Sequence, residues 1–196
     1  MKVGTRSLLF GAHQFLIHPC FVALAWWKLY GFPWDPRLWV AFFVHDLGYW
    51  GKPNMDGPEG DRHVVLGARI MGWLFDRWGK DHPHHASWYC FCYYHSRFMA
   101  KRCGVRYSRL CVADKLAVAL EPWWFYLPRV VLSGEIREYM ALARGERDSK
   151  YRGETGGDGH GTRRAWFRAC TSYLDRWAYE HRNGKDDTWT PVVNHD

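Results

Sequence analysis

The residues most able to do chemistry are His45 and Asp46, which stand side by side in the apolar run A-F-F-V-H-D-L-G at 41–48. An imidazole and a carboxylate are both metal ligands, and metals that accept both are common in hydrolases. Because neighbouring helical residues point about 100° apart, the two side chains can flank one ion beside the helix axis. Gly48 is expected to let the backbone leave that helix just past the pair.

Other histidines and aspartates lie in or beside apolar runs on other predicted helices: His18, His63, His95 and Asp114. A helical bundle can aim all of them at one interior point. Carboxylates in apolar runs are costly to bury unless an ion compensates their charge. Imidazoles and carboxylates without thiolates suit Mn, Fe, Co, Zn or Mg, with coordination positions left for water and substrate. Since the combined set exceeds the need of one ion, it predicts one or two divalent ions.

Apolar periodicity and breaker residues predict a chain of helices. The helices are expected at 7–29, 36–46, 63–78, 86–103, 108–120, 128–144 and 165–182. The stretch 48–62 is rich in Gly, Pro, Asp and Asn and is expected to be a loop. No convincing strand or internal repeat appears. The predicted class is therefore all-α, a single helical bundle domain.

The chain length fits one domain with a sizeable core. Its expected parts are a helical core at 1–143 that carries the metal site, a mobile loop rich in Gly and charge at 144–164, and a C-terminal helix and tail at 165–196 that pack on the core. The Gly-rich stretch 153–161 lacks a preceding strand and a G-K-[ST] ending, so it does not predict a phosphate-binding P-loop. Solvated loop histidines are expected at His82, His84 and His85.

Composition and charge favour a globular protein with an anionic ligand. Hydrophobic residues make up 47% of the chain and aromatic residues 18%, with 13 Trp, so some rings must lie partly exposed in a groove or interface. The net charge of +7 comes from basic residues spread over the whole chain. This distribution favours a small phosphorylated substrate and makes a long nucleic acid an unlikely partner.

The sequence contains no apolar stretch of about 18 residues and no signal peptide, so no membrane span or membrane partner is expected. The six Cys include no C-x-x-C pair and mostly sit among apolar residues. They are expected to be buried free thiols in a reducing compartment, which favours a cytoplasmic location.

Five segments carry the candidate ligands, and in this order they form a recognisable pattern. They read H-P-C-F-V-A-L-A-W-W-K-L-Y-G, A-F-F-V-H-D-L-G, H-V-V-L-G-A, Y-Y-H-S-R and V-A-D-K-L-A-V-A-L-E-P, within 18–129. The set resembles the HD superfamily of metal-dependent phosphohydrolases, whose signature is H…HD…D on separate helices of an all-α core. With its additional histidines it looks closest to the branch that splits diadenosine tetraphosphate.

The resemblance implies a two-metal site in an HD-type helical bundle. Asp46 is implied to bridge the two ions. One ion is implied to be held by His18, His45 and Asp114, and the other by His63 and His95. The implied reaction is hydrolysis of a phosphoester or phosphoanhydride bond of a nucleotide by a metal-bound hydroxide. The substrates within this expectation are dinucleoside polyphosphates, (deoxy)nucleoside mono- or triphosphates, and cyclic or alarmone nucleotides.

Catalytic and substrate-binding roles follow less directly. Many relatives carry Lys or an acid where this chain has Tyr49, so the proton donor is left open, with Lys52, Glu59 and Asp61 as candidates beside the catalytic Asp46. Phosphate contacts are expected from residues of the following set: Tyr49, Lys52, Arg97, Lys115 and Arg129. The rings at Tyr49–Trp50 and Trp123–Trp124 could stack a base, although Trp123 and Trp124 are expected more readily in the core.

Two other functions are left open by the sequence. One is a nucleotide- or nucleic-acid-binding module on the same fold with a structural metal site, and the other is an oxygenase with a mixed-valence di-iron centre. A homo-oligomer is also open. His13 shares the predicted helix 7–29 with His18, but a separation of five residues turns it by about 140°, so it is not expected to be a ligand.

Overall fold

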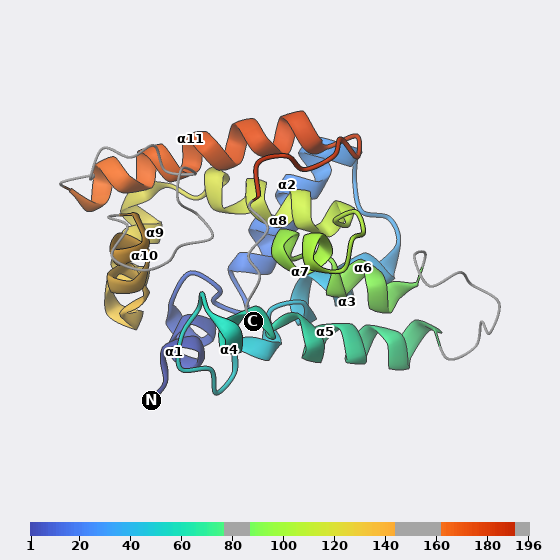
Figure 1. Ribbon diagram of the computed structural model, residues 1–196, viewed down its shortest axis with the longest axis horizontal. Coiled ribbons are helices and arrows are strands. Elements are labelled where there is room, and N and C mark those ends of the chain that lie inside the picture. The colour runs from blue at the N-terminus through green and yellow to red at the C-terminus, as the bar shows by residue number, and fades with distance from the viewer. Residues whose placement is uncertain (77–86, 144–161, 191–196) are drawn as a thin grey trace.

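The computed structural model describes residues 1–76, 87–143 and 162–190, and every regular element in these ranges is helical (Figure 1). The elements are α1 (Val3–Phe10), α2 (His18–Tyr30), α3 (Pro36–Val44), the 3₁₀ helix η1 (Leu47–Tyr49), α4 (Pro58–Asp61), α5 (Val64–Met71), the π-helical η2 (Gly72–Asp76), α6 (Trp88–Tyr93), α7 (Arg97–Arg102), α8 (Arg109–Leu120), α9 (Trp123–Ser133), α10 (Glu135–Ala143) and α11 (Arg163–His181). The predicted all-α class is confirmed.

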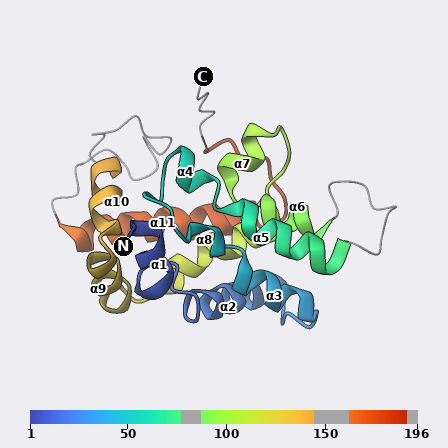
Figure 2. The same ribbon diagram turned by 90° about the horizontal axis from the view of Figure 1, so that it is seen from below.

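Helix α8 is the central element of the fold. It packs against α2 and α11, and in the view of Figure 2 it lies between them. Helices α9 and α10 pack together and contact α11, and α9 also contacts α1. Helices α5 and α6 pack on each other, while α3 contacts both α2 and α5. Residues of α8 are therefore enclosed by neighbours from both halves of the chain.

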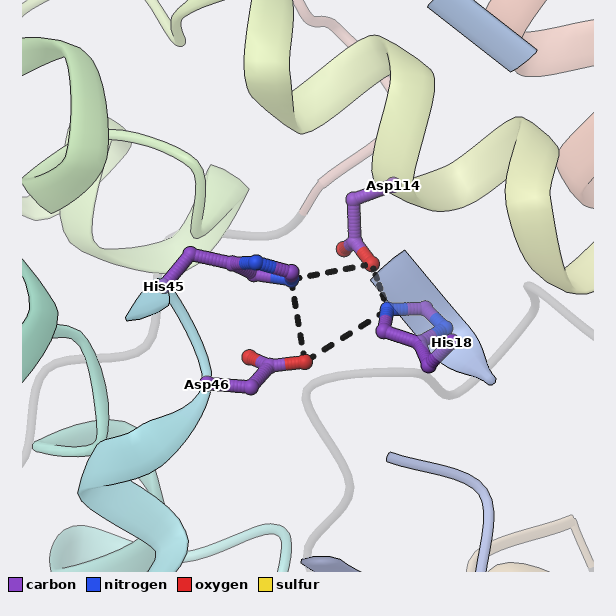
Figure 3. A group of neighbouring side chains, drawn as sticks. All are labelled: His18, His45, Asp46 and Asp114. Carbon is purple, nitrogen blue, oxygen red and sulfur yellow. Dashed lines mark hydrogen bonds and ion pairs between the residues drawn. The ribbon is translucent and has the colours of Figure 1, made fainter. Parts of the chain in front are cut away.

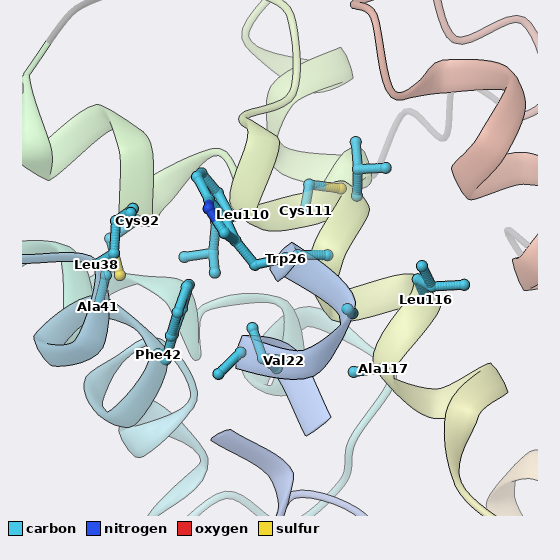
Figure 4. Close-up of a cluster of buried hydrophobic side chains, with 14 of the residues drawn as sticks. Val22, Trp26, Leu38, Ala41, Phe42, Cys92, Leu110, Cys111, Leu116 and Ala117 are labelled. Carbon is cyan, nitrogen blue, oxygen red and sulfur yellow. The ribbon is translucent and has the colours of Figure 1, made fainter. Parts of the chain in front are cut away.

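The main hydrophobic core lies where α2, α3 and α8 meet (Figure 4). The indole of Trp26 packs against the ring of Phe42 with 5.7 Å between centroids. Helix α8 buries an almost continuous series of mostly small and aliphatic side chains: Leu110, Cys111, Val112, Ala113, Leu116 and Ala117. Each large aliphatic side chain buried there contributes about 1.5–3 kcal/mol. This packing fixes the helix that carries Asp114.

The predicted helix 7–29 is two helices in the structure, α1 and α2. Gly11 follows α1, and a side chain there would meet Glu135, because a Cβ would lie 1.9 Å from Oε1 of that residue. The side-chain oxygen of Gln14 then accepts from the backbone N–H of Ile17 at 2.6 Å, which holds a turn before α2. Pro19, the second residue of α2, is a helix-start signal that fits this break. The apolar periodicity is continuous across this break, so the sequence pattern did not reveal that there are two helices.

Two other predicted helices are also divided, and the predicted loop 48–62 contains η1 and α4. The expected helix 86–103 is α6 and α7, and each begins with a serine cap: Ser87 accepts from the N–H of Cys90 and Ser96 from that of Met99. The expected helix 128–144 is the end of α9 and all of α10. Gly134, with φ of 90°, separates them, in a conformation that favours glycine.

The cysteines are only partly where the sequence suggested. All six are free thiols. Cys92 and Cys111 are buried, but Cys20 and Cys103 are exposed, so the expectation of uniformly buried thiols is wrong. Cys103 stands just after α7, between Arg102 and Gly104, whereas the exposed Cys20 has apolar sequence neighbours that gave no sign of its exposure.

No helix in the described part of the chain is long and apolar enough to cross a membrane. The predicted loop histidines at 82–85 and most of the predicted loop 144–164 lie outside the described residues. The helix predicted at 165–182 is α11, Arg163–His181, which packs along α8.

Gly48 has a different role from the one that its position suggested. It lies within η1 and does not have a positive φ, so it is not the residue that releases the chain from α3. Instead, the backbone of His63 passes so close that a Cβ on Gly48 would lie 1.8 Å from the His63 carbonyl oxygen. The missing side chain lets the segments that carry Asp46 and His63 approach each other.

We expect Gly48→Ala to lower the free energy of unfolding by about 1–3 kcal/mol, because a rigid backbone must move to admit the methyl group. Denaturant unfolding measures this effect. Gly72→Ala is the matched control, since the nearest atom to its methyl group is Cβ of Tyr89 at 3.2 Å, a far milder contact than the 1.8 Å approach at Gly48. Equal stability losses in the two variants would contradict the close-approach explanation.

Candidate metal centre

Helix ends meet around a buried cluster of the predicted ligands (Figure 3). His18 is the first residue of α2, His45 and Asp46 follow α3, and Asp114 lies within α8. His18 and His45 are 1% exposed, and Asp114 is 5% exposed. The structure thus brings together residues up to 96 positions apart in the sequence.

The first group consists of His18, His45, Asp46 and Asp114. One ligand atom from each lies within 4.8 Å of every other, a spacing that could hold a metal ion. Nε2 of His18 is 2.9 Å from Oδ1 of Asp114 and 3.5 Å from Oδ2 of Asp46. Nε2 of His45 is 3.0 Å from the same Asp46 oxygen and 3.8 Å from Asp114.

The second group consists of Asp46, His63 and His95, with the same mutual spacing. Oδ1 of Asp46 is 3.6 Å from Nε2 of His63 and 3.4 Å from Nε2 of His95. The two imidazole Nε2 atoms lie 3.1 Å apart. The Asp46 carboxylate therefore turns one oxygen toward each group and is common to both.

The protonation of three imidazoles is set by their own backbone. Nδ1 of His45 donates to the Phe42 carbonyl at 2.9 Å, and Nδ1 of His63 donates to that of Gly60 at 2.7 Å. In the same way, Nδ1 of His95 donates to the carbonyl of Cys92 at 2.5 Å. With the proton on Nδ1, a neutral ring presents a bare Nε2 lone pair to the cluster. This is the tautomer that metal-binding histidines adopt when a carbonyl holds the second nitrogen.

The cluster satisfies a direct test of fit to a cation. Nε2 of His45 and Oδ2 of Asp46 are buried and have no hydrogen-bond partner among the described residues, even though the two atoms are 3.0 Å apart. The facing Nε2 atoms of His63 and His95 cannot both be lone pairs at 3.1 Å without a proton or cation between them. Buried acceptors that converge in this way are costly by themselves and suit a shared divalent ion.

Electrostatics in the metal-free cluster are dominated by Asp46 and Asp114. Burial works to raise the pKa of Asp46, but the neighbouring His45 and His13 hold it well below its ordinary value. For Asp114 burial is likewise outweighed, chiefly by Lys115 and His18, and its pKa is also well below the ordinary value. Both carboxylates are therefore ionised and available as ligands.

His45 and His63 differ in the direction in which their pKa values are shifted. Burial lowers the pKa of His45, but the charges of Asp46 and Asp114 overcome this effect and raise it to about 10. The pKa of His63 is held well below 6.5, first by burial and then by His95. At neutral pH His63 is therefore a neutral ligand, whereas His45 must release a proton before it can bind a cation.

A cavity of about 200 Å³ opens from both groups. Of the residues predicted to act on substrate, Tyr49, Asp61, Arg97 and Lys115 line it. The Tyr49 ring stacks on His63 with 4.1 Å between centroids and an interplanar angle of 7°. Nζ of Lys115 lies 2.8 Å from Oδ2 of Asp114. Arg97 is buried and donates to the hydroxyl of Tyr173 at 2.9 Å.

The other predicted residues do not line the cavity. Glu59 is exposed on α4 and accepts from Asn54 at 3.1 Å, and Lys52 lies before that helix. Arg129 donates to the Gly11 carbonyl at 2.9 Å and pairs with Glu121, so it ties α9 to the segment after α1. The geometry gives these three residues no contact with the cluster.

The aromatic wall of the cavity also differs from the one suggested by the sequence. Trp50, Trp123 and Trp124 are 63%, 43% and 62% exposed, and none lines the cavity, so the core placement of Trp123 and Trp124 is wrong. Aromatic residues that do line it, besides Tyr49, are Phe98, Tyr126, Tyr139 and Trp166. Tyr126, Tyr139 and Trp166 come from helices after α8, where ordinary amphipathic spacing gave no sign that a stripe faces a cavity.

His13, which was not expected to be a metal ligand, belongs to neither ligand group but lines the cavity. Its ring centroid lies 5.6 Å from that of His18 and 4.7 Å from that of Tyr49. The angle of about 140° between His13 and His18 applies only to one continuous helix. Because the chain breaks between α1 and α2, that angle does not describe the structure. Burial lowers the pKa of His13, but Asp46 and Glu135 outweigh this and raise it above 6.5.

Loss of single ligands should separate the two groups. We expect the wild type to bind up to two equivalents of Mn²⁺ or Zn²⁺, His95→Ala to bind about one, and Asp46→Ala to bind almost none, because only Asp46 serves both groups. Elemental analysis after dialysis measures the ratio. Glu59→Ala, at an exposed position, should match the wild type, and a His95→Ala protein with full metal content would contradict the assignment.

His45 should make the metal-free protein less stable in alkaline solution. Because its pKa is raised from 6.5 to about 10 on folding, its contribution is fully present below pH 6.5 and is lost as the pH rises through 10. Unfolding by denaturant between pH 6.5 and 10 measures the decline. His45→Gln should flatten this dependence, as should bound metal, which displaces the proton. An unchanged slope in His45→Gln would show that another group titrates.

Comparison with models of known protein families, with characterised proteins and with solved structures finds no match to this chain. Its family is therefore not assigned by similarity, and any functional conclusion depends on the cluster and its cavity.

Proposed function

We propose that this protein is a metal-dependent phosphohydrolase of the HD type that cleaves a phosphoester or phosphoanhydride bond of a nucleotide. The observation that carries the proposal is the pair of buried ligand groups that share Asp46 at the wall of one cavity. The order of the ligands along the chain, H…HD…H…H…D, agrees with the resemblance to that superfamily. A purely structural metal site would have no need of a cavity beside it.

The ligand groups suggest how the ions are held. His18, His45 and Asp114 would hold one ion, His63 and His95 would hold the other, and Asp46 would contribute to both. When bound, two such ions lower the pKa of water toward about 7 and neutralise phosphoryl oxygens. The chain itself contributes fixed imidazoles, since the carbonyls of Phe42, Gly60 and Cys92 keep three rings in orientation.

The cavity has a polar end and an apolar end, as a nucleotide requires. Near the cluster, Lys115 has two further N–H donors beside the one it gives to Asp114, and Arg97 adds a second positive charge. The apolar end of the lining belongs to one hydrophobic cluster that includes Val118, Tyr139 and Trp166, and Asp56 is a charged residue that also lines the cavity. The basic end suits phosphate and the apolar end suits a base or another planar group.

Hydrolysis and plain binding can be told apart by one experiment. We expect release of phosphate or of a nucleotide product when dinucleoside polyphosphates and (deoxy)nucleoside phosphates are screened with Mn, Co, Fe, Zn or Mg. Asp46→Ala should reduce kcat by at least about 100-fold, equivalent to roughly 3 kcal/mol of transition-state stabilisation. Glu59→Ala should keep full activity. A folded, metal-loaded wild type that binds nucleotides without turnover would favour the binding-module alternative.

The apolar end can be tested by filling it. Cys170, half-buried on α11, lines the cavity, so Cys170→Phe should occupy the space proposed for the base. We expect KM for the nucleotide to rise about tenfold or more, because a pocket group of this size is worth at least 1 kcal/mol. Cleavage of a small phosphate ester without a base should change by less than about twofold. Cys20→Phe, at an exposed thiol, is the control, and equal effects on both substrates would reject the base pocket.

A further inference from the structure

His13 lies in the cavity wall beside the ligand cluster without belonging to either ligand group. It stands in the turn between α1 and α2, and its side chain is 19% exposed. Its ring lies between His18 and Tyr49, so it borders both the cluster and the space proposed for substrate. A histidine at this place can contact a substrate that the cluster holds.

The hydrogen bonds of Ser7 determine which nitrogen of His13 carries the proton. Oγ of Ser7 lies 2.9 Å from Nδ1 of His13, and the same oxygen accepts from the His13 backbone N–H at 3.3 Å. Ser7 is fully buried, and its hydroxyl proton has no other acceptor among the described residues. The hydroxyl therefore donates to Nδ1 of the neutral ring, which places the ring proton on Nε2.

Nε2 of His13 carries a hydrogen whether the ring is neutral or charged. If His13 is protonated, both nitrogens carry hydrogen, and Nδ1 faces Oε2 of Glu135 at 3.7 Å as well as Ser7. In both states Nε2 is a donor. No described residue accepts a hydrogen bond from Nε2 of His13, and the ring lines the cavity. The Nε2–H group is therefore available to a ligand in the cavity.

Glu135 fixes the backbone on which His13 stands. This carboxylate is fully buried and accepts from the backbone N–H of Ala12 at 3.1 Å, from Ser133 Oγ at 2.5 Å and from Tyr139 Oη at 3.0 Å. The missing side chain of Gly11 leaves room for it. A buried carboxylate is costly unless donors satisfy it, and here the donors lock residues next to His13 in place.

We infer that His13 is a substrate-binding residue that donates a hydrogen bond from Nε2 to a phosphoryl oxygen, with Ser7 and Glu135 as its positioning residues. The inference rests on the proposed phosphohydrolase function and adds a contact that the ligand cluster does not provide. A donor of this kind, held by a hydroxyl and a carboxylate, binds oxygen anions and gives no comparable contact to an uncharged group.

The test uses His13→Leu, which removes the donor at similar bulk, and His13→Gln, whose amide N–H reaches about as far as Nε2. We expect His13→Leu to lower kcat/KM and to weaken inhibition by inorganic phosphate by about 10- to 100-fold each, as expected for one hydrogen bond to a charged group. His13→Gln should recover most of both losses. Metal content should match the wild type in both variants and both should fold, although His13→Leu should be less stable because the buried Ser7 hydroxyl loses its acceptor.

Ser7→Ala gives a second measurement that packing alone would not move. It should weaken inhibition by phosphate about fivefold, because the released ring can take the other tautomer, which has a bare Nε2. In the background of His13→Gln, which has no tautomers, the same change should have almost no effect. This non-additivity is the signature of tautomer control.

The outcomes separate the inference from the function on which it rests. An active wild type with His13→Leu within twofold of it, or with His13→Gln as impaired as His13→Leu, overturns the inference and leaves the phosphohydrolase proposal standing. Loss of metal in His13→Leu also overturns it, since the residue would then act through the cluster. A wild type that hydrolyses no nucleotide with any of the metals rejects the proposed function and the inference with it.

Discussion

The structure depends on the concentration of negative charge and imidazole lone pairs at one buried point. Two ionised carboxylates, Asp46 and Asp114, lie there with four imidazoles, and all six side chains belong to buried residues. Such an arrangement is expensive unless every group is oriented and a cation or proton lies between them. Three of the histidines, His45, His63 and His95, stand at helix ends, where a backbone carbonyl three residues earlier holds Nδ1.

Helix α8 supplies the rigid part of this arrangement. It is packed on two neighbours and carries Asp114 from its interior, whereas the other ligands stand at helix boundaries. Close backbone approach completes the site, since Gly48 lets the chain after Asp46 touch that of His63. The cluster is therefore assembled by packing between segments distant in sequence. Its geometry depends on the stability of the core formed by α2, α3 and α8.

The cavity beside the cluster presents oriented polar side chains to a ligand, as the cluster does to ions. Its lining combines acidic and histidine side chains, the basic residues Lys115 and Arg97, and an apolar cluster that includes Val118, Tyr139 and Trp166. His13 also lines the cavity, and both Ser7 and Glu135 lie near its Nδ1 atom. Buried polar groups that are fully satisfied in this way act as fixed donors and do not reorganise when a charged molecule enters.

The sequence by itself determined the helical class and the six residues of the cluster, because ligand chemistry in apolar surroundings is visible in residue types and local spacing. Only the tertiary structure decided where the helices stop. The break at Gly11 depends on the distant Glu135, and the break before Ser96 depends on a serine cap whose stabilising effect is set by packing. The apolar periodicity continues across both breaks and therefore does not reveal them. The same contacts brought His13 into the cavity and kept Arg129 out of it. Which polar side chains meet across the chain is a property of packing, and a linear pattern does not contain it.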